Sequence, residues 1–437
     1  MKNLKTLEIG KNVKLTLIPE SKFKTNLVSV YILRELDRKE VTKNALLPGI
    51  LKSGCDKYKT LGQLTNREEE LYGSYLNAGT SKRGEHQVLG FSILGVNEKY
   101  LDEKILGGCI DLLNEIINNP LIVDGGFSEE YLKIEKEILK DSIMGIINDK
   151  GTYAMKQASE IMFEGEPYAI SGKGYIEDLD DINGVNLYQH YKNILKTSPI
   201  EIIIEGEFDE SEVVELIKER FTFDRGDIID LPKEEFYKEV DEVKEVKETM
   251  DIAQGKLVMG YRCNVDYLDE ERYYSLLLGS RILGGGADSK LFVNVREKES
   301  LCYTIYSTIQ KSKSTMMVCS GIEAENYERT VELVKEQVQK LKDGDITETE
   351  IANAKIAFIN SDVKLAHKTA LQDDIIDDLY NAVYIDCISA MKRDEKNIVQ
   401  AVKLLLVGRF LERIGDHVTN ICEMIIYSIK GEMLELD

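Results

Sequence analysis

The sequence predicts an α+β protein made of two similar α/β units, the second of them truncated, followed by an antiparallel helical segment. Strand-like runs open the chain, a block of helical patterns follows, and a strand returns near residue 200. The same order of patterns starts again near residue 250. From residue 348 onward the strand patterns stop. The predicted segments are residues 1–222, a charged linker at 223–249, residues 250–361 and residues 362–437.

The first unit is predicted from apolar periodicity. Val28, Val30 and Ile32 alternate along one run, so they lie on the same face of a strand. Strands are expected at residues 4–10, 13–19, 26–33, 79–84, 86–97 and 199–206. Helices are expected at residues 41–54, 60–76, 98–117, 127–147, 152–163 and 210–221.

The second unit follows a stretch that is rich in charge and poor in apolar residues. That stretch predicts an interdomain connector or, equally, a solvated helix. Strands are then expected at residues 255–263, 303–309 and 314–322, and helices at residues 269–283, 325–342, 348–392 and 395–429. The last of these carries the apolar stripe of a bundle helix.

Composition limits the classes of function. The chain has 437 residues and a net charge of −22, which argues against nucleic acid or an anionic membrane surface as a partner. Seven scattered cysteines without a CxxC pair indicate reduced thiols. No apolar run approaches the ~20 residues of a membrane span, and no signal peptide is recognised at the start. We therefore expect a cytoplasmic protein.

The stretch from Leu283 to Tyr303, LGGGADSKLFVNVREKESLCY, stands out. Three glycines allow a helix end or a close approach of another chain segment. Arg296 and Tyr303 stand seven residues apart, and together they could hold a peptide carbonyl or carboxylate. The alternative is a glycine turn with a surface arginine and a core tyrosine. A phosphate-binding loop is disfavoured, because neither the Walker pattern nor GxGxxG is present around Lys290.

The two units and this stretch resemble the insulinase/pitrilysin metallopeptidases over about residues 4–361. Active members of that family carry an HxxEH zinc motif on a helix in the first unit. Here the corresponding positions are Asn44, Leu47 and Pro48, which cannot supply the two zinc ligands and the base. The later glutamate of the family corresponds to Glu137, for which a solvated helix carboxylate is the alternative. The resemblance therefore implies a non-catalytic member without a zinc cofactor.

In two-subunit members of that family, the subunit without the motif supplies an arginine and a tyrosine from its second domain. The resemblance thus assigns substrate binding to Arg296 and Tyr303. It implies that the chain binds peptide and forms a heterodimer with an active zinc-peptidase homologue.

The tail resembles the C-terminal half of the PhoU phosphate-signalling proteins over about residues 362–437, most specifically in LERIGDHVTNICE. Glu412 and Asp416 are one helical turn apart, as are Asp373 and Asp377. The resemblance implies that these carboxylates bind Mg, Mn or Fe, and that phosphate-transport or sensor components are partners. The alternative is a solvated acidic face with ion pairs to nearby arginines.

The join between the two resemblances leaves two origins open. The chain is either a natural fusion or a reading frame joined by deletion or an assembly error, and in the second case neither parent function is intact. The apolar faces of a shortened unit and a half bundle would then be left uncovered.

Overall fold

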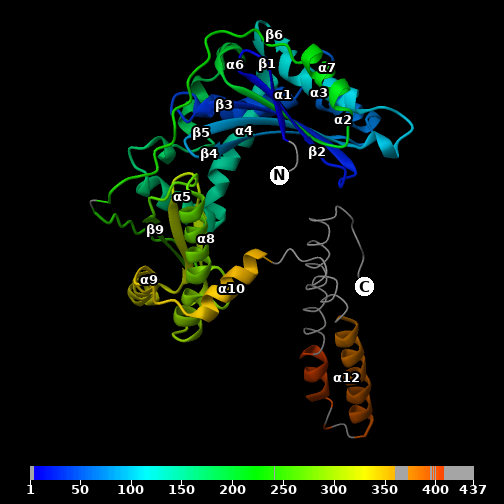
Figure 1. Ribbon diagram of the computed structural model, residues 1–437. Coiled ribbons are helices and arrows are strands. Elements are labelled where there is room, and N and C mark those ends of the chain that lie inside the picture. Colours follow the sequence, from blue (N-terminus) through cyan, green and yellow to red (C-terminus); the bar gives the residue numbers. More distant parts are fainter. Residues whose placement is uncertain are drawn as a thin grey trace. The chain divides into compact units, whose positions relative to one another are not determined.

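The computed structural model describes residues 4–240, 242–359, 373–393, 396, 398 and 400–407. Two compact units are present, one formed by residues up to 20 and from 25 to 354, and the other by residues 21–24 and from 355 onward. The first unit contains two α/β halves in succession, as the sequence predicts (Figure 1).

The first half is built on a six-stranded sheet with the order β1-β2-β8-β3-β5-β4. Its strands are β1 (Lys5–Gly10), β2 (Val13–Pro19), β3 (Thr25–Glu35), β4 (Tyr75–Arg83), β5 (His86–Val96) and β8 (Ile200–Gly206). Its helices are α1 (Val41–Lys52), α2 (Leu61–Glu70), α3 (Leu106–Asn118), α4 (Glu129–Met144), α5 (Lys150–Met162), α6 (Gly184–Thr197) and α7 (Glu210–Arg220). The short strands β6 (Ile122–Val123) and β7 (Gly126–Phe127) pair with each other.

Strand β8 is the last strand of the first half in the sequence, yet it lies in the interior of the sheet. It pairs in parallel with β2 and antiparallel with β3, so it lies between two strands that are formed much earlier in the sequence. Val28, Val30 and Ile32 of β3 are fully buried, which confirms the alternation seen in the sequence. Helices α1, α3 and α6 lie on one face of this sheet (Figure 1). The core of the first half is therefore a sheet covered by helices.

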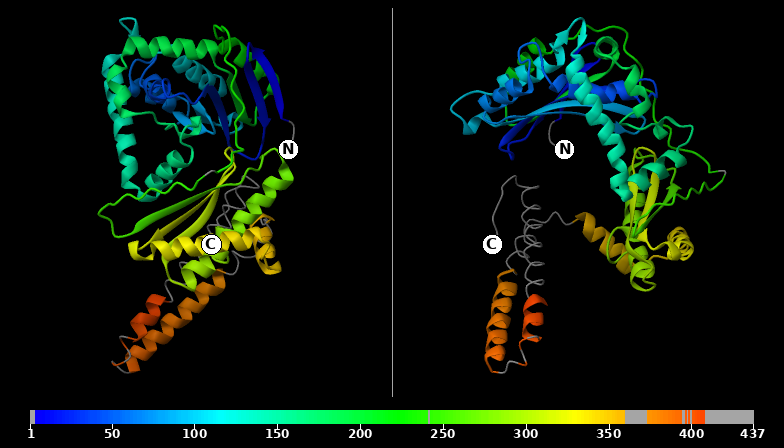
Figure 2. Two further views of the ribbon diagram at one scale, coloured as in Figure 1. Left: turned by 90° about the vertical axis from the view of Figure 1, so that its left-hand side faces the viewer. Right: turned by 180° about the vertical axis from the view of Figure 1, so that it is seen from behind.

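The second half has a smaller sheet with the order β10-β11-β9. Its elements are β9 (Gly255–Arg262), α8 (Glu270–Gly284), the π-helix η5 (Phe292–Glu297), β10 (Cys302–Gln310), β11 (Thr315–Ile322), α9 (Tyr327–Lys342) and α10 (Glu348–Ile359). Figure 2 shows these three strands as a sheet of their own. Among the described residues only β11 pairs with β9, and the apolar side chains of β9 are only partly buried.

The two halves pack against each other where α5 meets β9 and β11. Phe163, just after α5, is fully buried and packs with Met317 and Cys319 of β11. The chain between α7 and β9 forms no helix or strand in residues 221–240 and 242–254. The connection between the halves is therefore irregular, whereas their contact is packed.

Helix α6 was not expected from the sequence, and two other helices have a boundary six or more residues from the expected one. The helix expected at residues 60–76 ends at Glu70, because Tyr72 and Gly73 adopt positive φ angles of 58° and 70° that close a turn into β4. The helix expected from residue 98 begins only at Leu106. The carboxylate of Glu98 accepts a hydrogen bond from the Leu106 N–H at 2.7 Å and so caps the later start.

The tail is helical where it is described. Helix α12 spans Asp373–Arg393, and residues 400–407 are also helical. Across the described ranges, no helix is long and apolar enough to cross a bilayer.

Candidate functional site

Asn44 of α1, the residue expected where active members have the first zinc-binding histidine, belongs to a buried hydrogen-bond network. Asn44 is fully buried, and its amide N–H donates to Gln87 Oε1 of β5 at 2.9 Å. Its Oδ1 lies 2.7 Å from Nε2 of His190 on α6. Gln87 in turn donates to the carbonyl oxygens of Val41 and Gly172. Asn44 therefore ties α1 to β5 and α6, and its polar atoms are already used.

The histidine in this network is held neutral. Burial lowers the pKa of His190 to about 4. Since Oδ1 of Asn44 accepts, Nε2 of His190 must carry the proton that it donates. The ring is therefore a structural donor, and Nε2 is not free to bind a metal.

The other two residues expected at the motif positions belong to the core. Leu47 is fully buried and Pro48 lies inside α1. The Glu137 side chain is exposed and lies 4.0 Å from Lys140, so it sits on the solvated face of α4. The carboxylate that faces α1 is instead that of Glu135, which accepts a hydrogen bond from Ser53 at 3.1 Å, and burial raises its pKa. This surface is packed as an ordinary helix contact.

The glycine run ends α8, as predicted, and Gly284 is also needed for close packing against β10. A Cβ on Gly284 would lie 2.5 Å from the backbone N of Ser307 on β10. A Cβ on Gly286 would meet the guanidinium of Arg281, which pairs with Asp288 at 3.2 Å. Lys290 is buried and pairs with Glu350 at 3.0 Å, so its charge is already compensated. The stretch is a tight helix-to-strand junction.

Arg296 lies on η5, the π-helix that follows this junction. The N–H of Lys298 donates to the carbonyl of Val293, the i→i−5 bond of a π-turn, and such turns recur at functional sites. The Arg296 guanidinium lies 4.4 Å from the centroid of the Phe292 ring, and the side chain is 40% exposed. Its ion pair with Glu297 is long, at 3.8 Å. Arg296 is thus held in place by a ring while its polar face remains accessible.

Tyr303 lies near the start of β10 at an irregularity of the sheet. Cys302 pairs with Ile322 and Thr304 pairs with Gly321, so Tyr303 is the extra residue of a β-bulge. It is 63% exposed, which excludes the core tyrosine considered above. Burial raises the pKa of the Cys302 thiol, and the charge of Arg296 opposes that shift. Arg296 therefore lies within electrostatic range of the residue next to Tyr303.

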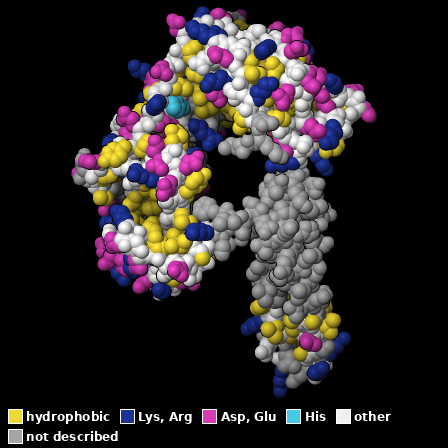
Figure 3. Space-filling model, viewed as in Figure 1, with side chains coloured by type: hydrophobic (Ala, Val, Ile, Leu, Met, Phe, Trp, Pro, Cys, Tyr) yellow, Lys and Arg dark blue, Asp and Glu magenta, His cyan; other side chains and the backbone are white. Residues whose placement is uncertain are grey.

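Sequence reasoning missed Tyr306. It is opposite Cys319 in the β10–β11 ladder and 49% exposed, on the face of the sheet away from α8 and α9. In the sequence, Tyr306 is a second tyrosine three residues after Tyr303, in an ordinary strand pattern. This pattern gave only a weak reason to select it. Figure 3 shows hydrophobic side chains between charged ones on the surface of the second half around α8.

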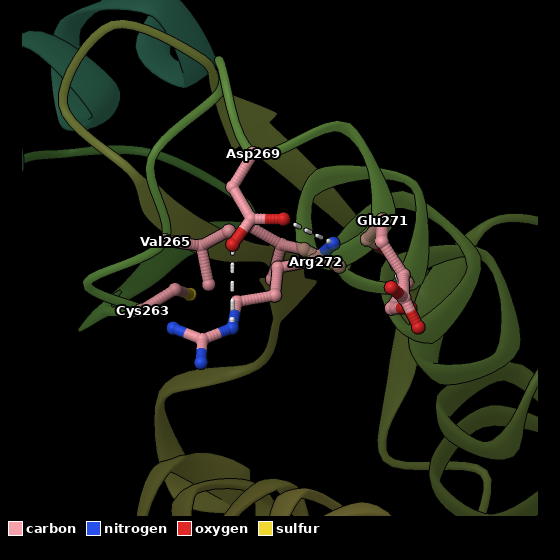
Figure 4. Close-up of a pocket in the computed structure, with 7 residues that line it drawn as sticks. Cys263, Val265, Asp269, Glu271 and Arg272 are labelled. Carbon is pink, nitrogen blue, oxygen red and sulfur yellow. Dashed lines mark hydrogen bonds and ion pairs between the residues drawn. The ribbon is translucent and has the colours of Figure 1, made fainter.

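A pocket of about 700 Å³ lies at the start of α8 (Figure 4). Asp269 caps the helix by accepting the N–H of Arg272 at 3.2 Å, and it also pairs with the Arg272 side chain. Burial raises the pKa of Cys263, another lining residue, so it is a poor nucleophile. The polar groups of this pocket serve the helix start, and we assign it no role.

Of the four metal ligands predicted for the tail, two lie in the described residues and two lie outside them. Asp373 and Asp377 lie on the first turns of α12, and their side chains are not described. Glu412 and Asp416 lie outside the described residues. Within the described part of the chain, no three His, Cys, Asp or Glu side chains are grouped as metal ligands would be.

Comparison with known proteins identifies the family of the chain. The profile of the "Peptidase M16 inactive domain" matches residues 181–358. "Probable inactive metalloprotease YmfF" of Bacillus subtilis (strain 168) is 34% identical over 346 residues, which cover 79% of this chain and 81% of that protein. The chain belongs to the M16 peptidase family. The crystal structure of a conserved protein from Enterococcus faecalis V583 aligns to this M16 chain with a TM-score of 0.76 at 27% identity, covering 95% of this chain and 96% of the other.

The C-terminal part of this M16 chain matches a second family. The PhoU domain profile matches residues 342–425, overlapping the end of the M16 match. A "Phosphate-specific transport system accessory protein PhoU homolog" of Clostridium acetobutylicum is 29% identical over 120 residues. These cover 28% of this chain, and they span only about half (53%) of that homologue. The M16 unit is thus of the inactive type and is followed by part of a PhoU domain.

Proposed function

We propose that the chain is a non-catalytic M16 subunit that binds an extended peptide and pairs with a zinc-bearing homologue. The observation that carries the proposal is the contrast between a buried position and an accessible pair of side chains. The zinc-motif position at Asn44 is buried and saturated with hydrogen bonds, whereas Arg296 and Tyr303 are accessible. A subunit built this way can hold a substrate and contribute no catalyst.

The two accessible side chains suit a peptide backbone. A guanidinium offers several N–H donors in a rigid fork, and it binds carbonyl and carboxylate oxygens. A phenol can donate to the next carbonyl along an extended chain. Phe292 beneath Arg296 restricts the guanidinium, which reduces the entropy lost on binding. Tyr306 adds an aromatic surface on the same strand.

The test begins with co-purification of the full chain with an HxxEH-bearing M16 homologue, followed by a peptidase assay of the mixture. Arg296→Ala and Tyr303→Phe are each expected to lower kcat/KM about tenfold or more, as loss of a charge-assisted contact would. Arg272→Ala and Tyr274→Phe are matched controls, because both side chains are exposed on α8. Unchanged activity in Arg296→Ala would refute the assignment.

A cytoplasmic location belongs to this proposal. The six cysteines of the described chain are all free, as is usual where thiols are kept reduced. Detection of the chain in a cytosolic fraction by immunoblotting would support it, and recovery outside the cell would contradict it.

The PhoU match supports a second candidate function, a metal-binding regulator of phosphate uptake acting through the tail. Its ligands would be Asp373, Asp377, Glu412 and Asp416, with Mg, Mn or Fe as the metal and phosphate-transport or sensor components as partners. Metal analysis of the purified chain, compared with Glu412→Ala and Asp416→Ala, tests this function. If the reading frame is a joined one, neither function is intact, and limited proteolysis should release no stable tail fragment.

A further inference from the structure

A buried cluster of charges joins the two halves of the M16 unit. Lys313 lies at the tip of the β10–β11 hairpin, and its side chain has no exposed area. Its ammonium group donates to Glu85 Oε1 at 2.6 Å and to the carbonyl of Glu235 in the connecting chain. Glu85 lies in the turn between β4 and β5. The tips of two hairpins, one from each half, are therefore held together by a buried ion pair.

A second carboxylate extends the cluster. Glu166 follows α5 and accepts from Arg262, at the end of β9, at 2.5 Å. Lys238 of the connecting chain lies 3.0 Å from the same carboxylate, and Lys313 lies 3.4 Å from its other oxygen. Burial alone would raise the pKa of Glu166, but the hydrogen bonds from Arg262 and Lys238 outweigh it and lower the pKa. Glu166 is therefore charged and compensated at neutral pH.

Aromatic rings, and the close packing of the Glu234 side chain against Gly84, keep water away from these charges. The Arg262 guanidinium lies 4.7 Å from the centroid of the Phe163 ring, and Lys313 lies within 6 Å of both the Phe163 and Tyr168 rings. A Cβ on Gly84 would overlap the carboxylate of Glu234, so the connecting chain lies directly against the β4–β5 turn. Charges in such a site attract strongly, and separating them requires rehydration.

The rest of the contact between the halves is limited. Its apolar part is the small group of residues around Phe163, Met317 and Cys319. Interfaces between domains that rely on polar contacts usually permit relative motion. The connecting chain, irregular at residues 221–240 and 242–254, is held to the halves by exposed contacts such as Lys244 with Glu164, and exposed ion pairs contribute little.

We propose that the Lys313 cluster is a latch that holds the two halves of the M16 unit docked, and that the halves separate when one of its charges is lost. Separation breaks the contacts of Lys313 with Glu85 and Glu166, and it uncovers the β11 surface that Phe163 covers. Cys319 lies on that surface and is buried in the docked state, so its thiol reports on the latch.

Thiol labelling of the full-length chain, with peptide mapping by mass spectrometry, tests the latch. In Lys313→Met, Cys319 is expected to react roughly tenfold faster than in the wild type, the effect of weakening one charged hydrogen bond. Cys109, in the core of the first half, is expected to keep its rate. Lys340→Met removes an exposed lysine of α9 that pairs with Glu336, and it is the matched control.

Glu85→Gln provides a second variant that keeps the shape of the cluster and removes one charge. It decides the question if Lys313→Met does not fold. Unchanged labelling of Cys319 in the folded variants overturns the proposal. So does equal acceleration of Cys109, because the unit would then open as a whole. This assay needs no peptidase partner, so its result is independent of the proposed function.

Discussion

Replacing Asn44 by alanine removes the residue that joins α1 to β5 and α6. The change leaves two buried polar groups without their partner, Oε1 of Gln87 and the N–H of His190. Each orphaned group costs ~1–3 kcal/mol, while the Gln87 amide keeps its two carbonyl partners. We therefore expect the free energy of unfolding of the first half to fall by about 2–6 kcal/mol.

The measurement is urea unfolding of the full chain, followed by hydrogen exchange of α1, β5 and α6, because a chain of several units need not unfold in one step. Asn77→Ala is the control, since Asn77 is exposed on β4. A loss in Asn44→Ala below about 0.5 kcal/mol, the range of surface substitutions, would refute the assignment of this residue to a buried network.

Three further outcomes are expected. Folding lowers the pKa of His190 from 6.5 to about 4, so the stability that its neutral ring contributes is complete above pH 6.5. About 3 kcal/mol of this stability is lost as the pH drops from 6.5 towards 4. The unfolding free energies of the wild type and His190→Gln should therefore differ above pH 6.5 and converge below pH 4. Gly284→Val should destabilise the second half by ~1–3 kcal/mol, because its Cβ would collide with the backbone of Ser307, and a Tm equal to the wild type would contradict this. Tyr191→Phe should lower the free energy of unfolding by ~1–2 kcal/mol, since it leaves the Ile117 carbonyl without its 2.6 Å hydrogen bond. Denaturation midpoints measure this loss, and a midpoint equal to that of the wild type would contradict it.

Local periodicity predicted most of the first half because its elements follow simple rules. The alternation around Val30 carries over directly into β3, and the apolar run from Ile200 becomes the central strand β8. Helix α6 was not predicted, and the remaining errors lie where single residues decide a boundary. Tyr72 takes a left-handed conformation, which its residue type disfavours, and Glu98 caps a helix eight residues away through its side chain.

The candidate site was predictable only in part, since side-chain environment depends on tertiary contacts. Arg296 and Tyr303 were found because their spacing resembles a family motif, but the exposure of Tyr303 arises from a bulge that no pattern shows. Lys313 lies in a polar turn that looks solvated in the sequence. Its burial is created by Glu85 and Glu166, which are more than 140 residues away along the chain.

The smaller sheet of the second half has a consequence for the order of unfolding. In the first sheet, β3 has a hydrogen-bonded neighbour on both edges, whereas β9 has one neighbour among the described residues. Amides at an unpaired edge exchange through small fluctuations, and units with few cross-strand bonds open at low free energy. We expect native-state exchange to distinguish two cooperative units in the M16 part, with β9 the first strand to exchange and β3 among the last. Proteases that need an extended segment should then cut first between α7 and β10.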